Sequence, residues 1–309
     1  MKTLLILACV LGLAPSAFAA GSGATGWAPA VLPQSVQRDL PSHHTGRSYR
    51  IFVSKPSAPA PATGYPVIYV LDGNAQFPLL ALQARAQEKR AAVTGQAPTL
   101  VVGIGYPIDG LNDEQARAED YTPPAADLSD TGDEQARRQG GADRFLAFVE
   151  DELKPLIERS YPVDRQRQTL FGHSYGGLFT LHTLFTRPQA FQTYLAISPS
   201  IWWNHRQILD EQRAFAQRLA DRPQPLRLFL GVGALEQPSP LDAGGNDPRR
   251  QRLDSRRMVD NVRELAATLA PLERAGLRSQ LRIFPDEGHG TTALVASGRA
   301  LGFAAGQPE

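Results

Sequence analysis

Cysteine is almost absent from the sequence, and this absence excludes several kinds of site. Among 309 residues the only cysteine is Cys9, which lies in an apolar stretch near the N-terminus. If that stretch is removed on export, no cysteine remains to form a disulfide, to ligate a metal or to act as a nucleophile. A nucleophilic side chain would then have to be something other than cysteine.

An excess of charge of either sign is also lacking. The 32 lysines and arginines nearly balance the 31 acidic residues. Nothing therefore points to nucleic acid or to a membrane surface as a partner. The length allows one α/β domain or two small ones. No internal repeat and no linker indicates a second domain.

The N-terminal segment has the pattern of an export signal. Lys2 supplies a positive start, residues 3–13 form an apolar run, and Ala17-Phe18-Ala19 is a small-x-small cleavage site. The run is too short to be a stable bilayer anchor. A lipoprotein site at Cys9 is the rival interpretation, which the very short apolar run before it disfavours. We predict a signal peptide over residues 1–19 and a periplasmic or secreted protein.

Fully apolar segments alternate with segments of helical periodicity along the chain. The apolar segments include residues 66–71, 100–105 and 226–232. Continuous apolar strands that alternate with helices predict a mostly parallel sheet covered by helices on both faces. Residues 48–53 alternate only in part, which favours a half-buried edge strand.

Three segments depart from this pattern. Residues 21–41 are rich in glycine, alanine and proline, and we expect them to run over the surface. Residues 106–141 are acidic and lack periodicity, which predicts a long loop. Helical spacing returns at residues 145–157, where Pro155 should kink the helix or mark its last turns.

The strongest chemical signal is the G-x-S-x-G motif at residues 172–176, which follows an apolar strand and precedes a helix. In such a motif a strained strand-to-helix corner exposes the hydroxyl, here that of Ser174. Small residues two before and two after the serine let neighbouring backbone pass. The amide of Tyr175, at a helix N-terminus, can stabilise an oxyanion. The motif also occurs by chance, so the rest of the chain must supply a base and an acid.

His289 is the histidine best placed to act as the general base. It lies between glycines just beyond the last apolar strand. Loops at the carboxyl ends of parallel strands converge on one rim, so His289 can reach the serine. The other five histidines lie on a surface loop, inside the serine motif, on the following helix or after a tryptophan pair: His43, His44, His173, His182 and His205.

Glu236 is the predicted orienting acid, because it directly follows the 226–232 strand and reaches the same rim. The chain order serine, acid, histidine is that of α/β-hydrolases. Asp242, Asp247 and Asp286 are the other candidates. Glu236 could instead be a solvated carboxylate at a loop tip.

The second oxyanion donor should come from the loop after the 66–71 strand. There Gly73 would let the backbone turn, so that the N–H of Asn74 faces Ser174. His289 would take the serine proton while the serine attacks an ester carbonyl and the two amides hold the oxyanion. This chemistry requires no metal and no organic cofactor.

The chain resembles the esterase D-like branch of the α/β-hydrolases, and within it the ferric-siderophore trilactone esterases that act on enterobactin and salmochelin. The resemblance runs in order from about residue 45 to the C-terminus. The matching stretches are residues 65–74, 103–107, 117–124, 172–177, 198–204 and 288–290. The resemblance implies an α/β-hydrolase fold over residues 20–309 and a small-molecule ester substrate, with a ferric catecholate siderophore as the leading candidate.

The resemblance also implies that Arg117, Trp202, Trp203 and Asn204 border the substrate. A ferric catecholate is anionic and aromatic, which suits an arginine and two tryptophans. The alternative is that the tryptophans are packing residues and the arginine is a surface cation. The acidic stretch 127–134 would oppose an anionic ligand unless it points outward.

Other functions remain open at this stage. A carbohydrate-ester or feruloyl esterase is the nearer alternative, and acyl transfer to an alcohol uses the same acyl-enzyme. An S-formylglutathione hydrolase is disfavoured by the export signal, because those enzymes are cytosolic. A non-catalytic binding protein of the same fold is disfavoured by the intact serine, histidine and acid.

Overall fold

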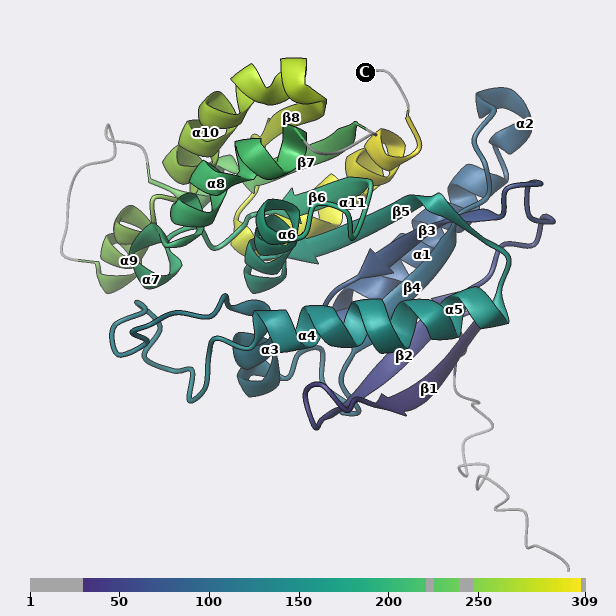
Figure 1. Cartoon of the computed structure of the whole chain (residues 1–309), viewed down its shortest axis with the longest axis horizontal. Coiled ribbons are helices and arrows are strands. Elements are labelled where there is room, and N and C mark those ends of the chain that lie inside the picture. Colours follow the sequence, from purple (N-terminus) through teal and green to yellow (C-terminus); the bar gives the residue numbers. More distant parts are fainter. Residues whose placement is uncertain (1–29, 221–224, 239–246, 307–309) are drawn as a thin grey trace, which may run out of the picture. The chain divides into compact units, whose positions relative to one another are not determined.

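An eight-stranded sheet forms the centre of the unit Gln34–Glu309 in this computed structural model, which describes residues 30–220, 225–238 and 247–306 (Figure 1). The strand order is β1-β2-β4-β3-β5-β6-β7-β8. Strand β2 is antiparallel to both of its neighbours, and all pairs from β4 to β8 are parallel. The strands are β1 (Ser35–Pro41), β2 (Ser48–Ser54), β3 (Tyr65–Val70), β4 (Leu100–Gly105), β5 (Val163–His173), β6 (Thr193–Ile197), β7 (Leu226–Gly233) and β8 (Leu277–Phe284).

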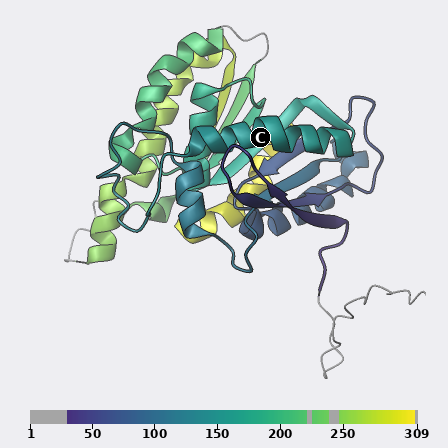
Figure 2. The same cartoon turned by 60° about the horizontal axis from the view of Figure 1, so that its bottom comes forward.

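Helices cover both faces of this sheet, as the alternating sequence predicts (Figures 1 and 2). Helices α1 (Gly73–Glu88) and α11 (His289–Ala304) pack together on one face, where Gln83 Nε2 donates to Ser297 Oγ over 2.8 Å. The other face carries α4 (Ala142–Ala147), α5 (Lys154–Ser160), α6 (Tyr175–Thr186) and α8 (Ile208–Ala220). This arrangement is the predicted α/β-hydrolase fold. No helix in the described part of the chain is long and apolar enough to span a bilayer.

Helix α10 (Met258–Leu269) packs against β7 and β8 with a mostly apolar buried face. The remaining helical segments are short or lie at the rim of the sheet. They are α2 (Ala91–Thr94), α3 (Glu114–Tyr121), α7 (Trp203–Arg206), α9 (Pro248–Arg256) and the 3₁₀ turns η2 (Ala234–Glu236) and η4 (Ala270–Ala275). The predicted signal peptide lies outside the described residues.

The edge of the sheet differs from the prediction. Residues 48–53 do form a strand, but β2 is the second strand rather than the edge. The edge strand is β1, in a segment that was expected only to run over the surface. Most of its side chains are exposed, so hydrophobic alternation could not reveal it. By contrast, every residue of β3 and β4 is buried, which is why their apolar runs were sufficient to predict both strands from the sequence.

The segment 106–141 is not wholly a loop, because it contains α3. The carboxylate of Asp113 caps this helix by accepting a hydrogen bond from Ala116 N over 3.0 Å. The expected disturbance near Pro155 is also present. A π-helical segment, η1 (Phe148–Leu153), joins α4 to α5 and places Pro155 in the first turn of α5, where a missing N–H costs little.

His182 joins three helices by hydrogen bonds on the α6 face of the sheet. Its Nδ1 lies 2.8 Å from Glu211 Oε2 on α8, and its Nε2 lies 3.2 Å from Asp143 Oδ1 on α4. The side chain is fully buried. Burial alone would lower the pKa of His182, but the bonds to Asp143 and Glu211 raise it to about 9. The histidine is therefore protonated near neutral pH and belongs to the scaffold.

This histidine should make stability depend on alkaline pH. Because its pKa is higher in the folded state than in the unfolded chain, its contribution is complete below about pH 6.5 and is lost as the pH rises toward 9. We expect His182→Gln to lower the free energy of unfolding by roughly 3 kcal/mol at pH 6 and by much less at pH 9.5. Denaturant titrations at both pH values measure this difference. His44→Gln, which removes an exposed histidine paired with Asp151, is the matched control. A pH-independent loss for His182→Gln would contradict the prediction.

Candidate active site

Ser174 occupies a strained corner between β5 and α6. Its backbone has φ 61° and ψ −119°, a conformation that side-chain-bearing residues rarely adopt. The corner depends on Gly172, because a Cβ there would lie 2.0 Å from the carbonyl oxygen of Gly176. The predicted need for a small residue at Gly176 is not seen, since a Cβ there would make ordinary contacts at 3.4 Å or more. Gly177 is the tighter position, at 2.9 Å from the backbone of Ile197.

The structure brings Ser174, His289 and Glu236 together at the carboxyl ends of β5, β7 and β8. His289 is the first residue of α11; its Nε2 lies 3.0 Å from Ser174 Oγ. Its Nδ1 lies 2.7 Å from Glu236 Oε2. With the carboxylate ionised, Nδ1–H donates to Glu236 and Nε2 is free to accept from the serine hydroxyl.

Glu236 is a buried carboxylate whose environment keeps it ionised. Only 1% of the residue is exposed, which excludes the interpretation as a solvated loop tip. Its Oε1 accepts hydrogen bonds from Ser198 Oγ at 2.5 Å, Gly233 N at 2.8 Å and Thr292 Oγ1 at 3.0 Å. Burial alone would raise the pKa of Glu236, but the hydrogen bonds from His289, Ser198 and Gly233 hold it below the ordinary value.

The other candidate acids lie elsewhere or outside the described residues. Asp247 caps α9 by accepting from Arg249 N over 3.0 Å. Asp286 is exposed in a turn with φ 62°. Asp242 falls outside the described residues. Among the described candidates, Glu236 is the one that contacts His289.

His173 is a site residue that the sequence interpretation discarded. Its ring packs against that of His289 with centroids 4.7 Å apart, and its Nε2 lies 3.0 Å from the His289 carbonyl oxygen. Desolvation of the ring and the neighbouring His289 lower the pKa of His173 to about 4. The neutral ring can therefore donate Nε2–H to that carbonyl and support the backbone of the predicted base. Its position next to Ser174 in the serine motif was the feature of the sequence that could have indicated a place in the site.

The corner after β3 lies beside the serine corner. A Cβ on Gly176 would be 3.5 Å from Asp72 Oδ2, which places the two turns against each other. The turning residue is Asp72, with φ 50°, and not Gly73 as predicted. Gly73 is required for another reason, since a Cβ there would lie 2.8 Å from the backbone of Ile104. Asn74 is the second residue of α1, so its N–H has no partner within the helix.

Arg117 does not have the substrate-contacting position that was predicted. Its guanidinium is buried and makes two hydrogen bonds to Asp72, Nε to Oδ1 at 2.8 Å and Nη2 to Oδ2 at 2.9 Å. It lies 5.6 Å from the ring centroids of both Tyr121 and Tyr175. The hydroxyl of Tyr121 in turn accepts from Asp72 N over 3.1 Å. Arg117 therefore fixes the corner at Asp72, which precedes Gly73 and Asn74 and lies against the serine corner.

Removing this guanidinium should impair turnover more than substrate affinity. For Arg117→Met we expect kcat on a small neutral aryl ester to fall about 100-fold with little change in KM, because the donor amides would shift. Unfolding should also become easier by about 3–5 kcal/mol, since Asp72 keeps a buried unpaired charge. The double variant with Asp72→Asn should recover much of the stability but not kcat. An unchanged kcat in Arg117→Met would refute the positioning role.

The tryptophan pair has two different environments. Trp203 is fully buried, and its Nε1 donates to Gln139 Oε1 over 3.1 Å, so it is a packing residue and not a substrate contact. Asn204 also has a structural position, because its N donates to Thr131 O over 2.9 Å and holds the neighbouring loop. Trp202 is half-buried and lines a cavity of about 890 Å³ beside this loop. Of the four predicted substrate contacts, only Trp202 reaches that cavity.

No group of three or more histidine, aspartate or glutamate side chains that could hold a metal ion occurs within residues 30–220, 225–238 and 247–306. The side chains that converge at the rim are instead a hydroxyl, an imidazole and an ionised carboxylate. Such a set can activate the hydroxyl as a nucleophile.

Comparison with known proteins also indicates an esterase. A family model described as "Putative esterase" matches residues 42–265. The ferri-bacillibactin esterase BesA of Bacillus subtilis is 42% identical over 276 residues, which cover 88% of this chain and 90% of that protein. The siderophore triacetylfusarinine C esterase of Aspergillus fumigatus is 40% identical over 252 residues, covering 78% of this chain and 83% of that protein.

Solved structures agree with these sequence matches. The crystal structure of the BES protein from Bacillus cereus superposes with a TM-score of 0.79 at 35% identity, covering 90% of this chain and 97% of that one. The strand order, the serine corner and the rim residues described above therefore occur on a fold shared with that protein.

Proposed function

The chain belongs to the esterase family whose model spans most of its length, it acts as a hydrolase on ester bonds, and from this premise we propose that it is an exported serine esterase of siderophore trilactones. The observation that carries the proposal is the continuous contact from Ser174 through His289 to Glu236. The named activities of its relatives, on ferri-bacillibactin and triacetylfusarinine C, support siderophore esters as the substrate class.

The proposed reaction begins with proton transfer from Ser174 Oγ to Nε2 of His289 as the oxygen attacks the ester carbonyl. The carbonyl oxygen becomes an oxyanion, which the N–H groups of Asn74 and Tyr175 stabilise. The imidazolium, held by Glu236, then gives its proton to the departing alkoxide, and an acyl-enzyme remains. Water repeats the sequence with His289 as base and releases the acid. Each of these side chains returns to its starting state.

Product analysis tests the proposed function. The chain from residue 20 onward is incubated with ferric enterobactin, iron-free enterobactin, a feruloyl ester and a simple acyl ester, and the products are identified by mass spectrometry. We expect the trilactone to be opened to linear hydroxy acids faster than the feruloyl ester is cleaved. Cleavage of the feruloyl ester without opening of the lactone would overturn the siderophore assignment and favour the alternative esterase. Ester exchange with an added alcohol, in preference to hydrolysis, would identify an acyltransferase.

Export is a separate part of the proposal, supported by the charge and apolar pattern of residues 1–19. The full chain is expressed in a Gram-negative host, and the protein in the periplasmic extract is sequenced from its N-terminus. A start at Ala20 or Gly21 is expected. Full-length protein in the cytosol alone would contradict export.

A further inference from the structure

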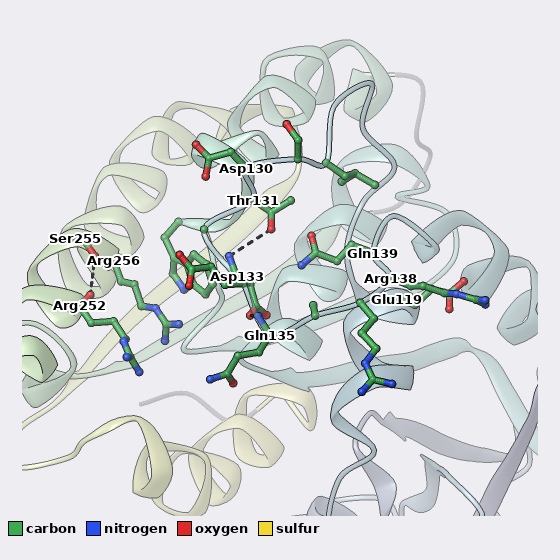
Figure 3. A pocket seen from close by; sticks show the side chains of 17 residues that line it. Glu119, Asp130, Thr131, Asp133, Gln135, Arg138, Gln139, Arg252, Ser255 and Arg256 are labelled. Atoms are coloured by element: carbon green, nitrogen blue, oxygen red, sulfur yellow. Dashed lines mark hydrogen bonds between the residues drawn. The ribbon is translucent and has the colours of Figure 1, made fainter.

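A large cavity lies between the 128–139 loop and helix α9, with Trp202 in its wall. Its volume is about 890 Å³. Figure 3 shows Arg252 and Arg256 of α9 on one side of the cavity, with Gln139 and Arg138 on the other. The cavity is thus built from two segments that are more than 100 residues apart in the sequence.

The cavity adjoins the nucleophile through Tyr175, the residue after Ser174. The rings of Tyr175 and Trp202 lie with centroids 6.1 Å apart. The hydroxyl of Tyr175 donates to Asp133 Oδ2 of the loop over 2.5 Å. A substrate whose ester carbonyl lies at Ser174 would therefore extend an arm past Tyr175 into this cavity.

Four arginines line the cavity without an ion-pair partner in the described part of the chain. They are Arg137, Arg138, Arg252 and Arg256. Natural proteins rarely gather unpaired cations around a cavity, because their mutual repulsion is unfavourable. Such a gathering indicates that an anion supplies the missing charge.

The acidic residues of the lining are largely engaged elsewhere. Glu119 forms two ion pairs: its Oε2 lies 2.9 Å from Arg47 Nη2, and its Oε1 lies 2.8 Å from Arg144 Nη2. Asp130 lies 3.5 Å from His205. Asp133 accepts from Tyr175 and from Gln135 N. Glu134 alone among these four has no recorded partner in the described residues.

Arg256 is the arginine most constrained in position. Its guanidinium carbon lies over the Trp202 ring, 4.2 Å from the ring centroid, so the ring supports the cation from one side. Arg252 lies one helical turn earlier on the same face of α9. Burial does most to lower the pKa of Arg256, and the charge of Arg252 adds to this, while Tyr175 and the nearby carboxylate of Asp133 offset only part of the effect.

We propose that Arg252 and Arg256, with Trp202 as support, form a subsite for an anionic aromatic arm of the ester substrate, such as a catecholate. A planar guanidinium can stack on an aromatic ring and donate paired hydrogen bonds to adjacent oxygens. This inference rests on the proposed esterase function and assigns its charge preference to α9 in place of Arg117. The expected substrate is still anionic and aromatic, but the residues proposed to bind its charge are now Arg252 and Arg256.

Steady-state kinetics of Arg252→Gln, Arg256→Gln and the double variant test this subsite. Arg249→Gln is the matched control, because Arg249 is an exposed residue of α9 outside the cavity. We expect KM for ferric enterobactin to rise about tenfold for each lining arginine removed. Turnover of the neutral p-nitrophenyl acetate should stay within about twofold of wild type. The wild-type KM for the anionic ester should rise with salt, and less so in the double variant.

A second measurement keeps the subsite separate from the proposed function. The anionic arm alone, 2,3-dihydroxybenzoate, is tested as a competitive inhibitor of p-nitrophenyl acetate turnover. Its inhibition constant should rise about tenfold in Arg256→Gln. If the wild type opens no catecholate lactone, the proposed function fails and this constant alone decides on the subsite. Unchanged constants in the double variant, equal losses on the anionic and neutral esters, or no inhibition of the wild type would each overturn it.

Discussion

Ser174→Ala is expected to lower kcat/KM for p-nitrophenyl acetate by at least about 10⁴-fold, because it removes the hydroxyl that lies against His289 Nε2 and would attack the ester. The alanine keeps the Cβ and the strained backbone, so the corner loses only the oxygen that faces His289 Nε2. The remaining contact of that oxygen, with Ser200 Oγ, is long at 3.5 Å. We therefore expect the thermal unfolding midpoint to change little. Kinetics and thermal unfolding measure the two effects separately.

Ser200→Ala is the matched control for this loss. Its hydroxyl is buried next to the nucleophile but lies away from the hydrogen bonds of His289. Activity should stay within about tenfold of wild type. Mass spectrometry after treatment with a fluorophosphonate gives a further readout, since Ser174→Ala should show no adduct. Undiminished activity, or an adduct on the alanine variant, would place the nucleophile elsewhere.

The sheet could be predicted because its central strands are buried on both sides. For β3 and β4 burial demands an unbroken apolar run, and such a run is visible in the sequence. Strand β1 and helix α9 have no such signal, because their side chains are mostly exposed. Helix α3 was missed for another reason. Its buried face includes a charged residue, Arg117, whose burial depends on Asp72, 45 residues earlier in the chain.

The rim residues could be predicted from the strand topology, whereas the arginine and tryptophan residues around the substrate could not. Ser174, Glu236 and His289 each follow a parallel strand, so their convergence follows from the strand order. The sequence could not distinguish a free arginine from one held by a carboxylate. The sequence therefore led to Arg117 as the arginine that contacts the substrate, a position that we propose for Arg256. Trp202 and Trp203 are likewise indistinguishable in the sequence. Only the packing of the fold shows that Trp203 is buried while Trp202 lines the cavity.

Glu236→Gln is expected to lower kcat by about 10⁴-fold through the wrong imidazole tautomer. The oxygen Oε1 accepts from Ser198, Gly233 and Thr292, so the carbonyl oxygen of a glutamine would take that position. Its NH₂ group would then face His289 Nδ1 and force that nitrogen to accept. The proton would move to Nε2, which could no longer take one from the serine. KM and the thermal midpoint should change little, because the buried donors stay satisfied.

Two further variants make this assignment of the acid decisive. Asp247→Asn and Asp286→Asn remove the other described candidates and should leave kcat within about twofold of wild type, since neither side chain reaches His289. Glu236→Asp keeps the charge but shortens the side chain, so it cannot serve His289 and the three donors at Oε1 together. We expect an intermediate loss of roughly 10–100-fold. Near-normal turnover in Glu236→Gln, together with a large loss in either aspartate variant, would show that another carboxylate orients the imidazole.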